Sequence, residues 1–308
     1  MFFLRGESQF SVYVFWTCPS LESAVIGDNV KAIPKRLLAD CNNIKSINLP
    51  NTLEEIGDGA LTRTGLTEVV IPGHVTHIGE GAFASCDNLT TLHFEAENCS
   101  VVQEETDMGL FYYCASLSNV TFGVNVTKIP NGLLSGCKMV SKIDIPETVT
   151  EIGAYAFSNT GLKEIIIPNA VEKIGCKALY SCFDLATVII GNYVSEIGSR
   201  AFASNNIKNV QSLSKIPPTM PEDTFFDLVY KNAALTIPNG TTDAYKMAIG
   251  WEKFTHYTEA GSSSLRGVNG TSDDEKVTFY NLQGIEVNNP QKGIFIRKQG
   301  NEMIKVVL

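Results

Sequence analysis

The sequence of 308 residues is poor in the residues and patterns that most often carry chemistry. It contains four histidines and two tryptophans, and none of its apolar runs approaches the ~20 residues of a membrane-spanning helix. Lysine and arginine total 24 against 33 acidic residues, so the net charge is -9. Nucleic acids and anionic membranes attract a basic surface, so the charge balance argues against both as partners. The lack of a long apolar run predicts that no segment spans a membrane.

The sequence also lacks the motifs of common catalytic sites. A phosphate-binding P-loop, H-E-x-x-H and G-x-S-x-G are all missing. His74 and His77 form an H-x-x-H pair, but zinc requires three or four ligands. A G-x-G-x-x-A match at residues 79–84 consists of repeated elements and has no βαβ unit around it. We therefore expect no enzyme activity, no cofactor and no metal.

A repeat of 21–24 residues dominates the sequence instead. Its frame is C/G-x-x-L-x-x-I-x-I-P-x-x-V-x-x-I-G-x-x-A-F-x-x, and its clearest copies are residues 41–64, 65–85, 137–160, 161–181 and 182–204. Residues 18–40 and 114–136 are weaker copies in which Leu-Leu replaces Ala-Phe. Such self-similarity is the signature of a solenoid.

A second, longer period of 96 residues is also present in the sequence. It separates Cys41 from Cys137 and Gly65 from Gly161. The pattern indicates that a block of four repeats was duplicated. Phe15 and Phe111 match at the same offset, so we expect the chain to begin inside an earlier repeat, with a signal peptide and further repeats upstream.

Six of the eight cysteines occupy one phase of the repeat, and only Cys99 and Cys176 do not. A cysteine that recurs once per repeat is more typical of a small buried side chain than of a disulfide. The sequence therefore predicts buried thiols.

Each repeat predicts one coil of a stack. In residues 89–94, Leu89, Leu92 and Phe94 point inward, while Thr91 and His93 point outward, as in a strand with one buried face. Proline ends the strand, and Ala-Phe closes the coil from a helical turn. Stacking at ~4.8 Å per rung pairs the strands into a parallel sheet.

This frame resembles the bacterial BspA-like, or Treponema-type, leucine-rich repeats over roughly residues 10–257. The resemblance implies an α/β solenoid, a leucine-rich-repeat right-handed superhelix with a parallel β-sheet on the concave face. It also implies a protein that is secreted or displayed on the outer cell surface.

The sequence predicts four segments: a solenoid of about eight to nine repeats (1–205), a capping repeat (206–258), a Gly/Ser-rich linker (259–272) and a small β module (273–308). In the capping repeat, Tyr245, Trp251 and Phe254 are expected to cover the open end of the core. The last segment, with YNLQG at 280–284, resembles type IX sorting domains of secreted Bacteroidetes proteins. That resemblance implies contact with secretion machinery; a docking or tethering role is the alternative.

The exposed side of the parallel sheet is the first candidate for a binding surface. Two residues per strand point outward there, and the face is polar, nearly neutral and without aromatic anchors. The expected positions are Ser23/Val25, Ser46/Asn48, Glu68/Val70, Thr91/His93, Asn119/Thr121, Lys142/Asp144, Glu164/Ile166 and Thr187/Ile189. A merely solvated strand face is the alternative reading.

The acidic insertion at residues 95–109 is the second candidate. It breaks the repeat length and carries Glu95, Glu97, Glu104, Glu105 and Asp107. Insertions in repeat proteins often lie on the binding face, although a solvated loop explains this segment equally simply.

These features favour a non-enzymatic secreted or cell-surface protein that binds a protein of a host or neighbouring cell. The alternatives are a structural spacer without a specific ligand and a glycan-binding accessory protein. The absence of aromatic side chains on the predicted concave face counts against the glycan alternative.

Overall fold

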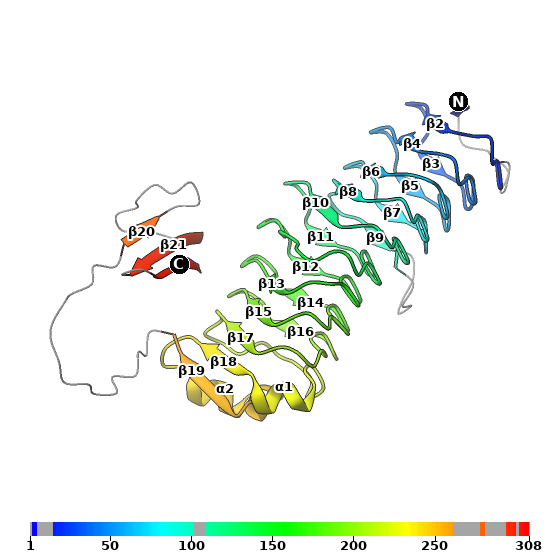
Figure 1. Cartoon of the computed structure of the whole chain (residues 1–308). Coiled ribbons are helices and arrows are strands. Elements are labelled where there is room, and N and C mark those ends of the chain that lie inside the picture. Colours follow the sequence, from blue (N-terminus) through cyan, green and yellow to red (C-terminus); the bar gives the residue numbers. More distant parts are fainter. Residues whose placement is uncertain are drawn as a thin grey trace, which may run out of the picture. The chain divides into compact units, whose positions relative to one another are not determined.

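The computed structural model describes residues 2–4, 15–101 and 109–260, together with strands at 278–280, 294–299 and 302–307. The chain divides into two compact units, Met1–Ser262 and Ser263–Leu308. The first unit is a stack of coils in which two rows of parallel strands run side by side (Figure 1). The expected leucine-rich-repeat solenoid with a parallel sheet is confirmed, with little helix.

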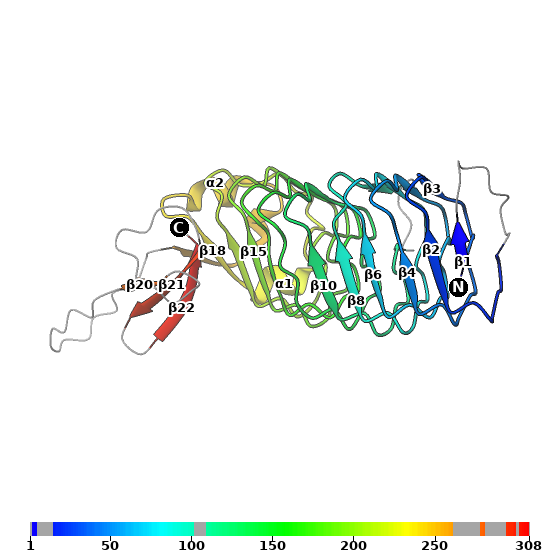
Figure 2. The ribbon, with the colours of Figure 1, turned by 90° about the horizontal axis from the view of Figure 1, so that it is seen from above.

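The longer strands form one side of the coils, except in the coil that contains residues 141–146, and they point in the same direction (Figure 2). Ladders of hydrogen bonds group them as β1-β2-β4, β6-β8-β10 and β13-β15-β17-β18-β19. Their bounds are β1 (Phe2–Leu4), β2 (Ser23–Ile26), β4 (Ser46–Asn48), β6 (Glu68–Ile71), β8 (Thr91–Phe94), β10 (Asn119–Phe122), β13 (Glu164–Ile166), β15 (Thr187–Ile190), β17 (Asn209–Ser212), β18 (Ala234–Ile237) and β19 (His256–Glu259).

The second row consists of strands of two residues, and all of them except β9 end in an isoleucine that is buried. It comprises β3 (Ala32–Ile33), β5 (Glu55–Ile56), β7 (His77–Ile78), β9 (Ser100–Val101), β11 (Lys128–Ile129), β12 (Glu151–Ile152), β14 (Lys173–Ile174) and β16 (Glu196–Ile197). Its outward residues form ion pairs between rungs, such as Lys173–Glu196 at 3.3 Å.

The prediction of a strand around Lys142 and Asp144 is wrong. Residues 141–146 keep the alternation of buried and exposed side chains, but they form no strand. They lie where the coil geometry changes, because the corner from Thr160 to Leu162 is one residue shorter than the corner from Cys137 to Val140. Because this corner is shorter, β13 is shifted relative to residues 141–146 and does not pair with them. The same change at Gly65 coincides with the break between β4 and β6.

The third side of each coil is a run of tight turns, so the helical turn expected at Ala-Phe is also wrong. Two residues in most coils have left-handed backbone angles, for example Gly59 (φ 56°) and Arg63 (φ 53°), and these angles prevent a helix from continuing. Alternate amides bond to the next coil instead, as from Leu61 N to Ala82 O at 2.8 Å. The turns therefore stack as regularly as the strands.

The core contains the apolar positions of the repeat, including Phe83, Phe111 and Phe157, which are fully buried. The rings of Phe83 and Phe111 stack with centroids 4.9 Å apart. Burial on this scale is the main driving force for stacking the coils.

The thiols at the repeated phase form a ladder through the core. Cys114, Cys137 and Cys182 each donate to a backbone carbonyl of the preceding coil, at 3.1, 3.3 and 3.1 Å. All eight cysteines are free, six are buried, and Cys18 and Cys176 are half-buried. The prediction of buried thiols at the repeated phase is confirmed for Cys41, Cys86, Cys114, Cys137 and Cys182 and is wrong for Cys18, while Cys99 is buried although it lies off that phase.

The C-terminal end of the stack carries the helices α1 (Asp227–Asn232), α2 (Thr242–Met247) and η1 (Trp251–Lys253) (Figure 1). Tyr245, Trp251 and Phe254 are buried in the core, as expected. Trp251 donates from Nε1 to Pro218 O at 2.7 Å, and the Tyr245 hydroxyl donates to Ser212 Oγ at 2.6 Å. The polar ends of these rings are thus satisfied while their faces pack.

The second unit contains β20 (Thr278–Tyr280), β21 (Ile294–Gln299) and β22 (Glu302–Val307), which form an antiparallel sheet in the order β20-β21-β22. Most of the YNLQG motif lies outside the described residues. The boundaries proposed for the four segments and the export role of 273–308 stay predictions.

Candidate functional site

The outward residues of the longer strands form a surface that we call the sheet face, which is divided into three parts by the breaks between β4 and β6 and at residues 141–146. Register places Glu68 beside Thr91 and Asn119, and Val70 beside His93 and Thr121. In the described chain beyond the break, Glu164 lies beside Thr187, and Ile166 beside Ile189. The structure therefore brings these predicted residues into two columns.

A polar network links three strands of the sheet face. The ring of His93 contacts Thr121 Oγ1 through Nδ1 at 2.7 Å and Glu68 Oε1 through Nε2 at 3.2 Å. His93 thereby joins β6, β8 and β10. Side chains that are held before a partner arrives lose less entropy on binding.

The remaining predicted positions are less connected. Ser46 and Asn48 lie on β4, where Ser46 pairs with Ser23 and Asn48 with Val25 of β2. Lys142 and Asp144 are exposed and bind each other at 2.9 Å, next to the break in the sheet. Val70 is 46% exposed, whereas Ile166 and Ile189 are half-buried, so Val70 is the most accessible of these three apolar side chains.

The acidic insertion is only partly described. Residues 95–101 complete a coil: Ala96 and Cys99 are buried, and Ser100 begins β9. Glu97 accepts a hydrogen bond from Asn125 Nδ2 at 3.2 Å. Glu104, Glu105 and Asp107 lie outside the described residues.

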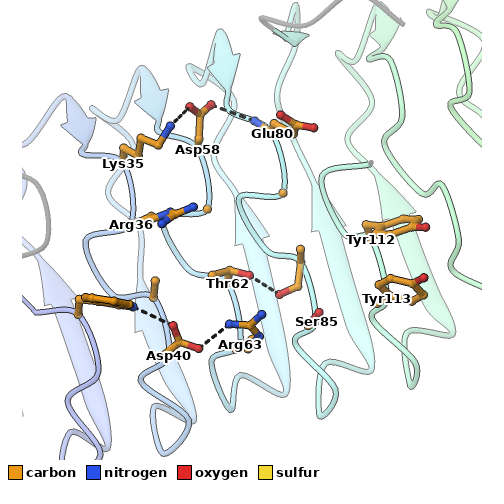
Figure 3. Close-up of a pocket in the computed structure, with 15 residues that line it drawn as sticks. Lys35, Arg36, Asp40, Asp58, Thr62, Arg63, Glu80, Ser85, Tyr112 and Tyr113 are labelled. Atoms are coloured by element: carbon orange, nitrogen blue, oxygen red, sulfur yellow. Dashed lines mark hydrogen bonds and ion pairs between the residues drawn. The ribbon is translucent and has the colours of Figure 1, made fainter. Parts of the chain in front are cut away.

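A second surface, which the sequence did not single out, lies on the turns of the first coils (Figure 3). This turn-face groove has a volume of about 470 Å³. Lys35, Asp58 and Glu80 follow one rim, Asp40 and Arg63 follow the other, and Tyr112 and Tyr113 stand at one end (Figure 3). Its remaining lining residues are Trp16, Arg36, Ala39, Gly59, Thr62, Gly81, Ala84 and Ser85.

Ion pairs and hydrogen bonds hold both rims in place. Lys35 Nζ contacts Asp58 Oδ2 at 3.0 Å, and the other Asp58 oxygen accepts from the Glu80 amide at 3.2 Å. Asp40 accepts from Arg63 at 2.9 Å and from Trp16 Nε1 at 2.8 Å. The rims are thus ordered by contacts between successive coils.

The Asp40 carboxyl is ionised more readily than an ordinary aspartate. Its partial burial acts to raise the pKa, but hydrogen bonds from Arg63 and Trp16, with the charges of Arg63 and Arg36, outweigh burial and lower the pKa. Asp40 therefore acts as a hydrogen-bond acceptor at neutral pH.

Aligning the coils by their backbone hydrogen bonds shows how the sequence could have revealed the groove. Trp16 and Tyr112 occupy the repeat position that Ala39, Thr62 and Ala84 occupy in between. Two aromatic residues that flank three small side chains at this position were the missed signal, and Tyr180 is a third aromatic residue at the same position in the second block. The alternation of inward and outward residues along the strands gives no information about the turn side of the coil.

Among the residues that the structure describes, no group of three or more His, Cys, Asp or Glu side chains is placed to hold a metal ion. His74 and His77 are both exposed. Within the same residues, no helix has the length and apolar character of a membrane span.

The fold and repeat define a bacterial type of leucine-rich-repeat solenoid. The family model of the BspA type leucine rich repeat region, which contains six copies, matches residues 8–106 and 104–230. The chain belongs to this family. No curated protein matches it.

Three solved bacterial structures are similar to this chain. A leucine-rich repeat protein from Bacteroides ovatus ATCC 8483 shares 26% identity at a TM-score of 0.55, with 76% of this chain and 61% of that chain covered. This chain thus spans less than two thirds of that relative. A leucine rich cell surface protein from Faecalibacterium prausnitzii A2-165 shares 18% identity at a TM-score of 0.40, with 85% and 88% covered. The pneumococcal vaccine antigen PcpA shares 18% identity at 0.41, with 78% and 80% covered.

Proposed function

We propose that this protein is a non-enzymatic binding protein, secreted or held on the outer cell surface, that contacts a protein partner through the sheet face. The observation that carries the proposal is the network in which His93 joins Glu68 and Thr121 beside the exposed Val70. It combines ordered polar groups with accessible apolar area, as protein interfaces do. Membership of a solenoid family supports the proposal, because stacked repeats present long surfaces suited to protein partners.

A binding assay with purified extracellular-matrix proteins tests this proposal. The full chain is immobilised, and each matrix protein is passed over it in a surface-plasmon-resonance experiment. We expect saturable binding of at least one of them. A variant with Thr91, His93, Lys142 and Asp144 all replaced by alanine should weaken it by about tenfold or more, because interface hot spots cost about 2 kcal/mol on truncation.

The matched control replaces four outward residues of the second row, Lys128, Glu151, Lys173 and Glu196, by alanine. It also removes exposed strand side chains and leaves the net charge unchanged. Binding that survives in this control but not in the first variant supports the sheet face. A folded chain without saturable binding, or equal loss in both variants, contradicts the proposal and leaves a spacer role.

A further inference from the structure

We infer that the turn-face groove is a binding site for a neutral oligosaccharide that lies along the stack of coils. This site is separate from the sheet face, and it does not depend on the protein partner proposed above. Four observations support it: the dimensions of the groove, its charge, its exposed aromatic rings and a filled copy of it elsewhere in the chain.

The groove has the shape of a trough for an extended chain. Its floor includes Ala39, Gly59, Gly81 and Ala84, which place no atom beyond Cβ in the space above the backbone, and the Arg36 side chain lies beside Gly59. Trp16 and Tyr112 lie four coils apart in one column. At ~4.8 Å per rung they are separated by roughly 19 Å, a length that suits a short oligosaccharide.

The charge of the groove favours a neutral ligand. Its lining contains three cationic residues (Lys35, Arg36 and Arg63) and three anionic residues (Asp40, Asp58 and Glu80), so its formal charge is zero. Two of each sign are already joined as Lys35–Asp58 and Arg63–Asp40. A polyanion such as heparin would gain no net attraction from this surface.

The backbone of the groove argues against a peptide. Amides of the floor are bonded from coil to coil, as from Gly59 N to Glu80 O at 2.9 Å and from Arg63 N to Ala84 O at 2.9 Å. A peptide that binds by strand addition requires an open sheet edge, and helices require an apolar groove. This surface offers neither of those modes.

The side chains instead match the two kinds of surface that a sugar presents. Trp16 is 51% exposed and Tyr113 63% exposed, so each side chain presents solvent-accessible ring surface that can pack against the C–H faces of pyranose rings. The carboxylates and cationic groups of the rims supply acceptors and donors at fixed positions for hydroxyl groups. Aromatic rings near both ends and ordered polar groups between them suit a hydroxyl-rich chain.

The second block of four coils contains a filled version of the same trough. At an offset of 96 residues, Tyr155 replaces Gly59 and Lys177 replaces Gly81, while Gly132 replaces Arg36. Lys177 Nζ donates to the Tyr155 hydroxyl at 2.6 Å, and Tyr155 is only 6% exposed. Both backbones are left-handed, with φ 56° at Gly59 and at Tyr155, so the position accepts either residue. The part of the trough above Gly59 and Gly81 is thus open in the first block and filled in the second.

Intrinsic fluorescence provides a direct assay for the full chain. Of the two tryptophans, Trp251 is completely buried, so ligand-dependent changes and acrylamide quenching report on Trp16. The probes are cellohexaose, xylohexaose, mannohexaose and maltohexaose, with isothermal titration calorimetry as the second readout. We expect at least one of these probes to bind saturably and to protect Trp16 from acrylamide.

Two variants remove the site in different ways. Trp16→Ala removes one aromatic end, and Gly59→Tyr fills the trough as the second block does; each should weaken binding by about tenfold or more. Gly240→Tyr is the matched control, because Gly240 is also left-handed (φ 75°), has open space around it and lies outside the groove. It should bind as the unmodified chain does, with thermal unfolding used to confirm that all variants fold.

Three results would overturn the inference. They are no binding of any of the four hexasaccharides, unchanged binding in Gly59→Tyr and Trp16→Ala, and binding only of heparin fragments or peptides at the groove. Loss of sugar binding in these variants with intact binding of a matrix protein would support two separate sites.

Discussion

The two blocks of four coils, which begin at Cys18 and Cys114, share their interior and differ on their turn side. Cys41 and Cys137 are both buried, and both donate to a carbonyl of the preceding coil, at 3.0 and 3.3 Å. Gly59 and Tyr155 are also separated by 96 residues and occupy the same repeat position. Gly59 leaves the trough open in the first block, and Tyr155 fills it in the second. Stacking constrains inward side chains and backbone hydrogen bonds, so outward turn residues are free to acquire separate roles.

The largest expected effect concerns the thiols, whose reactivity tests whether the blocks share one core. Burial raises the pKa of Cys137 to about 12 and also raises the pKa of Cys41. A raised pKa keeps a thiol protonated at pH 8, where the thiolate is the reactive form. We expect both to react with Ellman's reagent orders of magnitude more slowly than the half-buried Cys18 and Cys176.

Peptide mapping after partial labelling identifies the modified thiols, and labelling in denaturant provides the control. Fast labelling of Cys41 with full protection of Cys137 would break the comparison, because the two interiors would then differ.

A truncation in the core has the next largest effect. Phe83 is fully buried and stacks on Phe111, and the second block has Leu179 in its place. Phe83→Ala should lower the free energy of unfolding by about 3–5 kcal/mol through lost burial and a cavity. Phe83→Leu should cost less, since it retains more of the buried volume. Urea unfolding measures both, and a change below about 1 kcal/mol for Phe83→Ala would contradict the packing described.

The filled trough of the second block provides the smallest effect. Tyr155→Phe removes the hydroxyl that accepts a hydrogen bond from Lys177, and we expect a loss of about 1 kcal/mol in stability. Tyr193→Phe is the control, because Tyr193 is 59% exposed, and it should change stability by less than about 0.5 kcal/mol. Equal stability of the two variants would show that the Lys177–Tyr155 contact does not hold the filled trough together.

The strand side of the fold was predictable because side chains along a strand alternate between the two faces with a period of two residues. The alternation at Thr91–Phe94 assigns an inward and an outward side to each residue, and the register then follows from the repeat. The phase of the cysteines predicted the burial of five of the six for the same reason. These features depend on periodicity, which a single sequence displays.

The missed features depend on contacts between coils. The gap in the sheet at Lys142 and Asp144 arises from a corner that is one residue shorter at Gly161, although the local pattern there is still that of a strand. The turn-face groove combines Trp16, Asp40 and Tyr112 from three different coils. Its residues become neighbours only when the turns are aligned by their hydrogen bonds, so no local motif identifies it.

A crystal structure of the full chain with the tightest-binding hexasaccharide tests the central claim most directly. We predict that the sugar lies between Trp16 and Tyr112 above Gly59, with its hydroxyl groups bonded to Asp40 or Arg63. A sugar bound over Tyr155, on the sheet face, or nowhere on the turns of the first block would contradict the claim that the two blocks diverged there to leave a binding site.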